Sequence, residues 1–234
     1  MKNSSSLQTT LRLALHAVVP VVAGYLVLGA AFGILLYDAG YGFIWSLLMS
    51  TFIYAGSMEF AGVSLLTGGA TLVSAALMTL LVNARHMLYG ISMLDQYRDM
   101  GPAKPYLIFS LTDETYAVLC GGTPEGADCR LYPLLVSFID QLCWVIGSLL
   151  GSLIGSSLSI NTTGIDFAMT ALFLVIFVEQ LLSTRDHLPA AAGVGISLLC
   201  LVLCGPDRFL IPSMVLLLAS LTLYGMLLER RASA

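Results

Sequence analysis

Seven ionisable side chains lie within or beside long apolar stretches of this 234-residue chain. A charged group at the centre of a membrane helix costs at least about 2.5 kcal/mol on insertion scales, so each must be paired, protonated or turned toward water. Groups in that setting can carry protons or recognise a charged ligand, which makes them the first candidates for chemistry. They are Glu59, Arg85, His86, Asp113, Glu114, Asp140 and Glu179.

Glu59 follows a run of small residues in the segment Tyr54-Ala-Gly-Ser57-Met-Glu59-Phe-Ala-Gly62. Small side chains let backbones approach closely. This serves either tight helix packing or an unwound segment whose freed amide and carbonyl groups bind a substrate. The sequence leaves both alternatives open, and Tyr54, Ser57 and Glu59 are candidate site residues.

Arg85 belongs to the segment Asn83-Ala-Arg85-His86, where Tyr89 follows one helical turn later and Asn83 shares a neighbouring face with His86. A guanidinium group is not deprotonated in proteins. A buried Arg85 therefore needs a carboxylate, supplied by the protein or by a substrate. The alternative is that Arg85 extends to the membrane surface and His86 is a hydrogen-bonded core histidine.

Asp113 and Glu114 are adjacent acids in Thr112-Asp-Glu-Thr-Tyr116. Neighbouring residues point about 100° apart around a helix, so we expect one acid to pair and the other to reach water. Carboxyl groups inside a membrane form proton relays in pumps and transporters. The alternative is an ion pair with Arg85 that only holds two helices together.

Asp140 shares a helical face with Trp144, Gly147 and Gly151, a pattern that predicts a close helix contact with one polar group at its end. Glu179 ends an apolar run, and an interfacial position fits it as well as a buried site does. Asp140 is therefore the stronger candidate of the two.

These residues need membrane helices to position them. The chain is 58% hydrophobic and only 10% charged, with a mean hydropathy of +0.90, whereas soluble domains are about 25% charged. We expect an all-α, polytopic integral membrane protein whose solvent is the lipid bilayer. Residues 1–234 form a single transmembrane transporter domain in this interpretation, with a polar N-terminal segment at 1–12 and a C-terminal tail at 229–234.

Composition also excludes several classes of protein. The net charge of −4 leaves no basic surface for nucleic acid. The five cysteines are an odd set without paired CxxC spacing, so we expect no zinc site, disulfide framework or other cofactor. Neither a HExxH pair nor a GxSxG nucleophile turn is present, so no such motif supports an enzyme.

Apolar stretches separated by turn residues predict about eight spans. Their ranges are 13–37, 42–66, 71–94, 105–121, 131–156, 166–184, 188–204 and 209–228. The alternative for 42–66 is a re-entrant hairpin that enters the membrane and returns.

Lys and Arg accumulate in cytoplasmic loops. Eight spans with both termini inside place six such residues in the cytoplasm (Lys2, Arg12, Arg130, Arg185, Arg230, Arg231) and three outside (Arg98, Lys104, Arg208). A re-entrant 42–66 gives five against four, which discriminates poorly. We therefore favour eight spans and cytoplasmic termini.

Glycine spacing suggests an internal repeat. Gly29-x-x-x-Gly33 recurs 118 residues later as Gly147-x-x-x-Gly151, and Glu59 recurs 120 residues later as Glu179. Many transporters consist of related halves. Two weakly related four-helix halves in the same orientation are the corresponding expectation.

The segments Tyr54-Ala-Gly-Ser-Met-Glu-Phe-Ala, Asn83-Ala-Arg-His-Met-Leu-Tyr and Thr112-Asp-Glu-Thr-Tyr together resemble the AzlC family, the large subunit of branched-chain amino acid exporters. The resemblance covers essentially the whole chain. It implies a secondary exporter of small neutral amino acids in the bacterial inner membrane, working with a small AzlD-type membrane subunit.

The working hypothesis is therefore amino acid export driven by protons. Arg85 would bind a carboxylate, while Glu59 or Asp113 would bind ammonium or carry the coupling proton. The other classes that we consider are an ion or small-solute channel, a structural membrane subunit of a partner, and a membrane enzyme in which His86 and Asp113 act as base and orienting acid.

Overall fold

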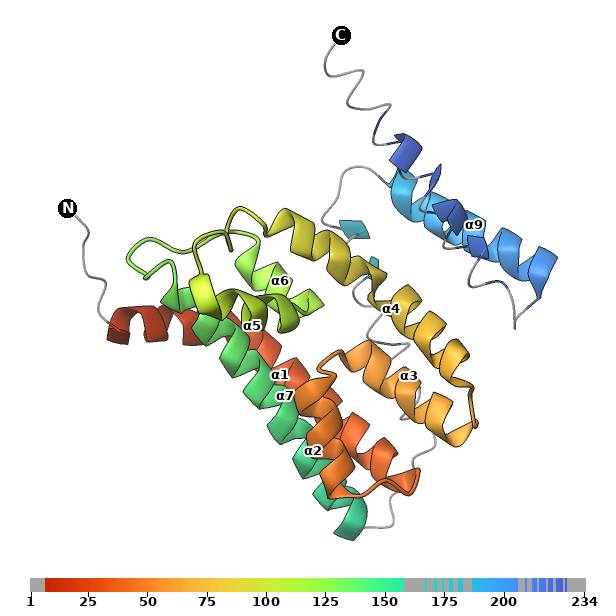
Figure 1. Ribbon diagram of the computed structural model, residues 1–234, viewed down its shortest axis with the longest axis horizontal. Helices are drawn as coiled ribbons and strands as arrows, with labels where there is room; N and C mark the ends of the chain where they lie inside the picture. Colours follow the sequence, from red (N-terminus) through yellow and green to blue (C-terminus); the bar gives the residue numbers. More distant parts are fainter. Residues whose placement is uncertain are drawn as a thin grey trace. The chain divides into compact units, whose positions relative to one another are not determined.

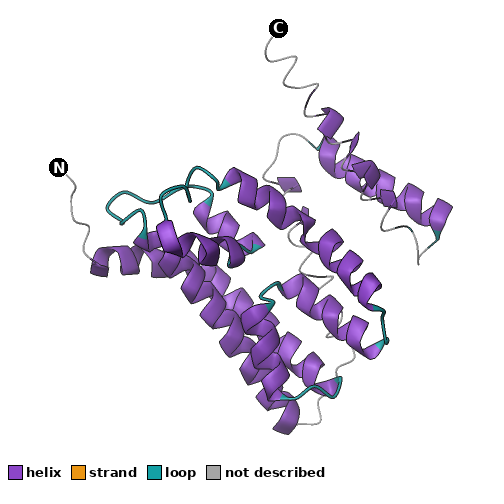
Figure 2. Ribbon diagram, in the orientation of Figure 1, coloured by secondary structure: helices purple, strands orange, loops and turns teal. Residues whose placement is uncertain are grey.

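The computed structural model describes residues 7–157 and 187–205, together with scattered positions between 167 and 182 and between 209 and 226. The chain forms two compact units, Met1–Met169 and Thr170–Ala234. Regular structure in the described residues is helical throughout (Figure 2). The predicted all-α membrane class is confirmed.

Three helices of the first unit are long and apolar enough to cross a membrane (Figure 1). They are α1 (Leu7–Asp38), α4 (Leu72–Ser92) and α7 (Leu131–Ser157). These correspond to the predicted spans 13–37, 71–94 and 131–156. In the second unit α9 (Leu188–Cys204) matches the predicted span 188–204. The predicted spans 166–184 and 209–228 lie largely outside the described residues, as does Glu179.

Helices α1 and α7 pack through the two glycine pairs found in the sequence. A Cβ atom at Gly29 would lie 2.9 Å from the carbonyl oxygen of Trp144, and one at Gly33 would collide with the carbonyl oxygen of Ser148. Gly151 makes the reciprocal approach to Ala30. Contacts advance in the same direction along both helices, so α1 and α7 run parallel with their backbones touching.

Residues 42–66 do not form one span. Helix α2 (Phe43–Phe52) ends at a tip whose Tyr54 has a φ of 43°, and α3 (Gly56–Thr67) begins after it. The Met49 methyl group lies 3.5 Å from the Cβ position of Gly62, so α3 folds back beside α2 (Figure 1). Each helix is about 15–18 Å long, half of an about 30 Å hydrocarbon layer. The predicted single helix is therefore broken into two short helices, the arrangement that the re-entrant alternative describes, and we call α2–α3 the first hairpin.

Residues 105–121 also differ from the predicted span. The short turn η1 (Gly101–Ala103) leads into α5 (Lys104–Phe109), and α6 (Asp113–Leu119) follows a break. Thr112 caps the new helix, because its side chain accepts a hydrogen bond from the Thr115 N–H at 3.3 Å. The prediction of one continuous helix here is wrong, and we call α5–α6 the second hairpin.

The two hairpins enter the unit from opposite ends. Leu36, Met49 and Val63 share an apolar cluster around the C-terminal half of α1, which holds the first hairpin. Leu107 and Leu119 belong to another cluster around its N-terminal half, which holds the second hairpin. The tips meet between the clusters, where the Tyr54 and Phe109 ring centroids are 6.2 Å apart. A long helix followed by a hairpin thus occurs twice, in opposite directions.

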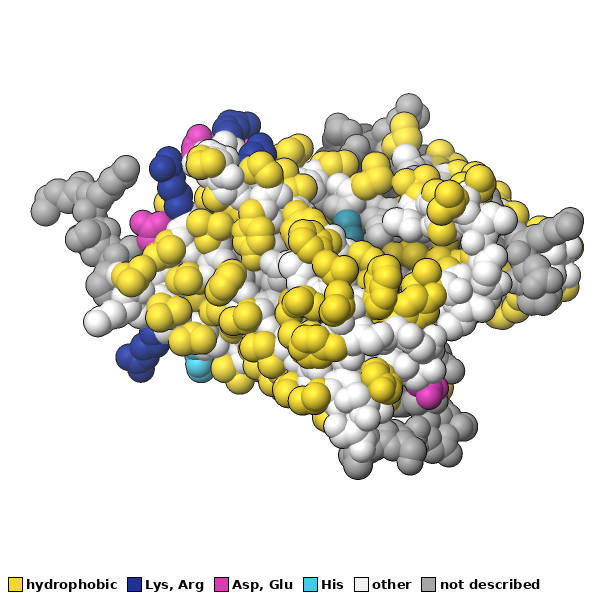
Figure 3. Space-filling model, turned by 60° about the horizontal axis from the view of Figure 1, so that its bottom comes forward, with side chains coloured by type: hydrophobic (Ala, Val, Ile, Leu, Met, Phe, Trp, Pro, Cys, Tyr) yellow, Lys and Arg dark blue, Asp and Glu magenta, His cyan; other side chains and the backbone are white. Residues whose placement is uncertain are grey.

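Apart from Arg85, the described basic residues of the first unit gather at the end where α1 and α7 begin. Arg12 lies on the first turns of α1, Arg98 follows α4, Lys104 begins α5, and Arg130 precedes α7. Figure 3 shows Lys and Arg side chains toward one edge of a mostly hydrophobic face. Arg98 and Lys104 thus lie at the same end of the first unit as Arg12 and Arg130, whereas eight spans would place them on opposite sides of the membrane. Lys2, Arg185, Arg208, Arg230 and Arg231 lie outside the described residues.

Candidate functional site

An ion pair stands at the middle of α4. The guanidinium Nη2 of Arg85 lies 2.8 Å from Asp113 Oδ2 in the first turn of α6, and the two side chains are 28% and 19% exposed. Arg85 therefore points into the first unit and not to the membrane surface. Of the two adjacent acids, Asp113 is the one that pairs, as one alternative for Arg85 predicted.

Both hairpins contribute to this ion pair. Arg85 Nη2 donates to Ser57 Oγ at 2.7 Å, which lies at the start of α3, while Asp113 lies at the start of α6. Tyr89, one turn after Arg85, donates its hydroxyl to Asp113 Oδ1 at 2.8 Å. Both oxygens of the Asp113 carboxylate therefore have partners, and the first turns of α3 and α6 converge on Arg85.

Glu114 is only partly buried. It accepts a hydrogen bond from the Tyr25 hydroxyl of α1 at 2.8 Å. Tyr25 also lies 2.6 Å from Thr112 Oγ1. Thr112 in turn donates to Thr115 at 3.0 Å, and Thr115 donates to Asp140 Oδ2 at 2.9 Å. A continuous series of oxygen atoms thus joins Glu114 to Asp140, which is fully buried on α7.

Glu59 occupies a different environment. It is fully buried in the first turn of α3, and Trp144 Nε1 of α7 donates to its Oε2 at 2.6 Å. Its other oxygen, Oε1, has no hydrogen-bond partner in the structure. The indole closes over this carboxyl group, since the Gly56 backbone also lies against the Trp144 ring. Glu59 is therefore separated from the Arg85 ion pair.

The remaining predicted residues lie around this centre. His86 is half-buried, with its ring centroid 5.9 Å from that of Tyr89. Asn83 is half-buried, and its Oδ1 has no hydrogen-bond partner. Tyr54 forms the tip of the first hairpin and is buried. The structure thus brings Tyr54, Ser57, Arg85, Asp113, Glu114 and Asp140 to one level of the first unit.

Tyr25 and Thr115 were missed as site residues. Tyr25 is one aromatic residue in an apolar span, and its sequence neighbours carry no signal of a partner. The helix start before Thr115 was visible, because a Thr followed by two acids is typical of a helix N-terminus. That signal places a helix N-terminus at Asp113, and the predicted continuous span concealed it.

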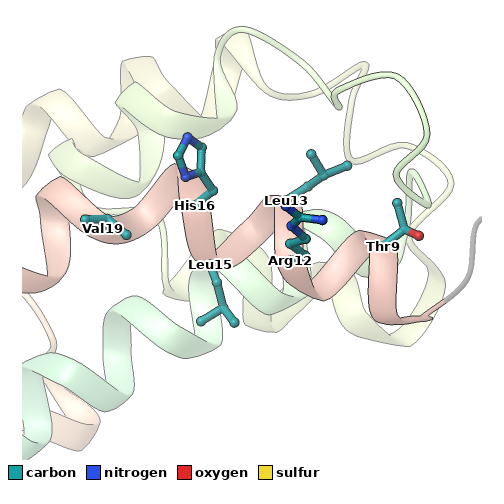
Figure 4. A pocket seen from close by; sticks show the side chains of 6 residues that line it. All are labelled: Thr9, Arg12, Leu13, Leu15, His16 and Val19. Carbon is teal, nitrogen blue, oxygen red and sulfur yellow. The ribbon is translucent and has the colours of Figure 1, made fainter.

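A surface pocket of about 580 Å³ lies elsewhere, along the outer face of α1 (Figure 4). Its walls come from Thr9, Arg12, Leu13, Leu15, His16 and Val19. None of these residues belongs to the buried polar centre, so this pocket is not the candidate site. Within the described residues no three His, Cys, Asp or Glu side chains are grouped so as to hold a metal ion.

The polar centre can do two things chemically. The Arg85 and Asp113 charges can bind a ligand that carries both signs of charge, because the pair is partly accessible. The carboxyl and hydroxyl groups between Glu114 and Asp140 can hold and pass protons. Both capacities concern binding and proton transfer.

The segments that form this site lie in a region shared with a known protein family. The profile of the AzlC protein family matches residues 20–158, which include α4, most of α1 and both hairpins. The chain belongs to the AzlC family. This assignment confirms the resemblance carried by the three polar segments, and all three lie in the matched region.

AzlC-family relatives from several bacteria cover nearly the whole chain. It is 40% identical over 231 residues to the branched-chain amino acid transport protein AzlC of Bacillus subtilis, covering 98% of this chain and 91% of that protein. It is 41% identical to an uncharacterized membrane protein of Helicobacter pylori, covering 90% and 93%. The inner membrane protein YgaZ of Escherichia coli is 27% identical, covering 84% and 81%.

No solved structure matches this AzlC-family chain. The apolar helices and the membrane-protein relatives agree on a multi-pass membrane location. Membership of a family that contains a transport protein favours a transporter over an enzyme.

Proposed function

We propose that this chain is the large subunit of a two-subunit secondary transporter that exports branched-chain or other small neutral amino acids from the bacterial cytoplasm in exchange for protons. The name of the Bacillus subtilis relative supports the class of substrate. The family resemblance supports the direction of transport and the small AzlD-type partner.

The observation that carries the proposal is the Arg85–Asp113 ion pair at the meeting point of the two hairpins. An amino acid carries a carboxylate and an ammonium group on adjacent atoms, and so presents the opposite charges to the same two residues. Its carboxylate takes the place of Asp113 on Arg85, and its ammonium group takes the place of Arg85 on Asp113. One ion pair is exchanged for two, which repays part of the cost of removing the substrate from water.

Glu59 takes no part in binding ammonium in this proposal. Its carboxyl group is fully buried beneath Trp144, whereas Asp113 is 19% exposed and already holds a cation. Ser57 and Tyr89 act as positioning residues, because each holds one member of the ion pair through a hydrogen bond.

A flux assay with a matched control tests this assignment. The surface pair Arg98–Asp95 has a similar N···O distance of 2.9 Å but side chains that are 75% and 90% exposed. In liposomes that contain the chain and its small subunit, Arg85→Gln should reduce flux of labelled leucine, valine or isoleucine by about 100-fold, because Asp113 loses its cation and the substrate carboxylate loses its partner. Arg98→Gln should leave flux unchanged. Equal flux in Arg85→Gln and the unmodified protein would reject the proposal.

Growth of bacteria gives a second test of the substrate class. Cells that lack the chain and its small partner should be inhibited by valine-containing dipeptides that they hydrolyse to excess valine. Expression of both subunits should restore growth, and expression with Arg85→Gln should not. Restored growth with Arg85→Gln would show that the ion pair is not the binding site.

The same proposal places the beginning of α1 in the cytoplasm. Arg12, Arg98, Lys104 and Arg130 support this orientation, because basic residues accumulate on the cytoplasmic side. Cys120 and Cys129 are exposed between α6 and α7, at the same end. In a variant whose other cysteines are alanine, a membrane-impermeant maleimide should label inside-out vesicles and spare intact cells. Labelling of intact cells would reverse the orientation.

A further inference from the structure

The oxygen atoms between Glu114 and Asp140 form a chain with an unusual hydrogen count. Four close pairs follow one another: Glu114–Tyr25 at 2.8 Å, Tyr25–Thr112 at 2.6 Å, Thr112–Thr115 at 3.0 Å and Thr115–Asp140 at 2.9 Å. A hydroxyl group donates one hydrogen bond. The three hydroxyl groups supply three hydrogens for four pairs.

The contact that lacks a hydrogen is the shortest of the four, between Tyr25 and Thr112. When Tyr25 donates to Glu114, and Thr112 donates to Thr115, neither hydroxyl has a hydrogen left for the 2.6 Å pair between them. Two oxygens at that distance without a hydrogen would repel each other. A fourth hydrogen must therefore enter the chain, and the two carboxyl groups at its ends are the groups that can bring it.

We infer that Glu114 and Asp140 share one proton, which travels between them through Tyr25, Thr112 and Thr115. This inference rests on the proposed function and supplies the path of its coupling proton. With the proton on Asp140, each group donates toward Glu114. With the proton on Glu114, every hydrogen bond is reversed. Transfer passes one proton at each link, so charge moves from one carboxyl to the other and every hydroxyl keeps one hydrogen.

The surroundings of the two ends differ. Asp140 interacts electrostatically with Glu114, with Tyr25 of α1, with Tyr54 of the first hairpin, with Tyr106 of α5 and with Cys143 of α7, none of which is a cation. A carboxylate without a cation is costly to bury, so the proton stabilises Asp140. Glu114 interacts with Arg85 and with its neighbour Asp113.

The Glu114 end therefore responds to the substrate site. While Asp113 neutralises Arg85, the positive charge available to Glu114 is small. When an amino acid enters and its carboxylate and ammonium groups rearrange the pair, the field at Glu114 changes. The position of the proton along the oxygen atoms between Glu114 and Asp140 thus depends on whether Arg85 and Asp113 pair with each other or with a substrate.

Removal of one hydroxyl group tests the relay. Thr115→Val keeps the shape of the side chain and breaks two of the four links, whereas Thr115→Ser keeps the hydroxyl group. Thr79→Val is the control, because the Thr79 hydroxyl donates to the Ala75 carbonyl of its own helix and lies outside the relay. The full chain and its small subunit are placed in liposomes that contain a pH-sensitive dye. Labelled leucine exchange is measured without a pH gradient, and leucine accumulation and proton movement are measured with one.

In Thr115→Val, leucine exchange should stay close to the rate of the unmodified protein. Gradient-driven leucine accumulation and proton movement should each fall by about tenfold or more. Thr115→Ser and Thr79→Val should keep both activities. Unchanged coupling in Thr115→Val overturns the relay, and so does a parallel loss of exchange and coupling, which indicates a structural role. Failure of the unmodified protein to exchange any amino acid counts against the proposed function instead.

An infrared spectrum decides the proton count without transport. The unmodified protein should absorb more in the carboxylic acid carbonyl band than the double variant Asp140→Asn/Glu114→Gln, by the amount of one carboxyl group. Equal absorbance would mean that neither end carries a proton, which would overturn the relay even if Thr115→Val does not fold.

Discussion

The first hairpin reaches the centre of its unit with helices of 10 and 12 residues, whereas the second uses helices of 6 and 7. Both place an acid in the first turn of their returning helix, Glu59 on α3 and Asp113 on α6. Glu59 is fully buried and bonded to Trp144, while Asp113 is 19% exposed and bonded to Arg85. The two hairpins thus carry acids at similar positions, but the Glu59 carboxyl group is enclosed by packing, whereas the Asp113 carboxyl group is accessible to a ligand.

The difference follows from what each hairpin packs against. The first hairpin lies on the apolar cluster that contains Trp144, whose indole supplies one donor and excludes other partners. The second hairpin lies beside α4, which supplies Arg85 and Tyr89. A broken helix frees polar groups in both cases, and the neighbouring helix decides whether they serve packing or binding.

The largest expected effect comes from disrupting the contact between α1 and α7, the two helices against which both hairpins pack. Gly33→Leu should yield no folded protein, because even a Cβ atom there collides with the Ser148 carbonyl oxygen. A Cβ atom at Gly24 on the same helix meets nothing within 4 Å and Gly24 is exposed, so Gly24→Leu should fold normally. Size-exclusion chromatography and thermal unfolding in detergent measure both. A well-folded Gly33→Leu would contradict the backbone contact.

The second prediction compares the two acids directly. Asp113→Asn should lower amino acid flux by about 100-fold, because Arg85 loses its charged partner. Glu59→Gln keeps an acceptor for Trp144 and should transport close to the unmodified rate. Flux of labelled leucine in liposomes checks both variants. A larger loss of leucine flux in Glu59→Gln than in Asp113→Asn would mean that Glu59 binds the substrate and Asp113 serves packing.

A smaller effect on stability should follow from Trp144→Phe. Phe keeps one aromatic ring but loses the second ring that carries the N–H. Glu59 Oε2 therefore loses its donor, and the free energy of unfolding should fall by about 1–3 kcal/mol from the hydrogen bond alone. Trp45→Phe is the matched control, since Trp45 is 52% exposed on α2. Denaturant unfolding in detergent gives the values. No difference between the two variants would mean that the indole hydrogen bond does not hold the first hairpin.

The smallest effect should come from Ser57→Ala, which removes one hydrogen bond to Arg85 and leaves its ion pair. We expect flux to fall by about fivefold, equivalent to about 1 kcal/mol. Ser64→Ala changes an exposed serine of the same helix and should have no effect. A loss in Ser57→Ala as large as that in Asp113→Asn would show that the first hairpin contributes to binding on equal terms.

Hydropathy predicted α1, α4, α7 and α9 well, because an apolar run of about 20 residues has few other stable forms in lipid. It failed at both hairpins, since two short helices contain as many apolar residues as one span. The Thr112 cap before two acids could have revealed the second break. The small residues after Tyr54 allowed the first break without requiring it, because tight packing uses the same composition.

The site was predictable to a similar degree. Arg85 and Asp113 could be paired from the sequence, because a permanent charge in lipid needs an opposite charge. The placement of Ser57 beside Arg85 could not, since it depends on the first hairpin folding back. Glu114 was expected to reach water, and its bond to Tyr25 depends on how α1 lies against α6. Whether the chain contains two related halves remains a prediction, because much of the second half lies outside the described residues.

The glycine contact between α1 and α7 constrains any transport cycle. Backbones that touch leave no space for sliding or for a side chain to enter, so the two helices move as one rigid body. In the proposed transport cycle, opening of the Arg85 site toward each side of the membrane comes from displacement of α4 and the hairpins relative to this pair. We expect each hairpin to close the path on one side in that cycle, so that two gates of unequal length rest on one rigid pair of helices.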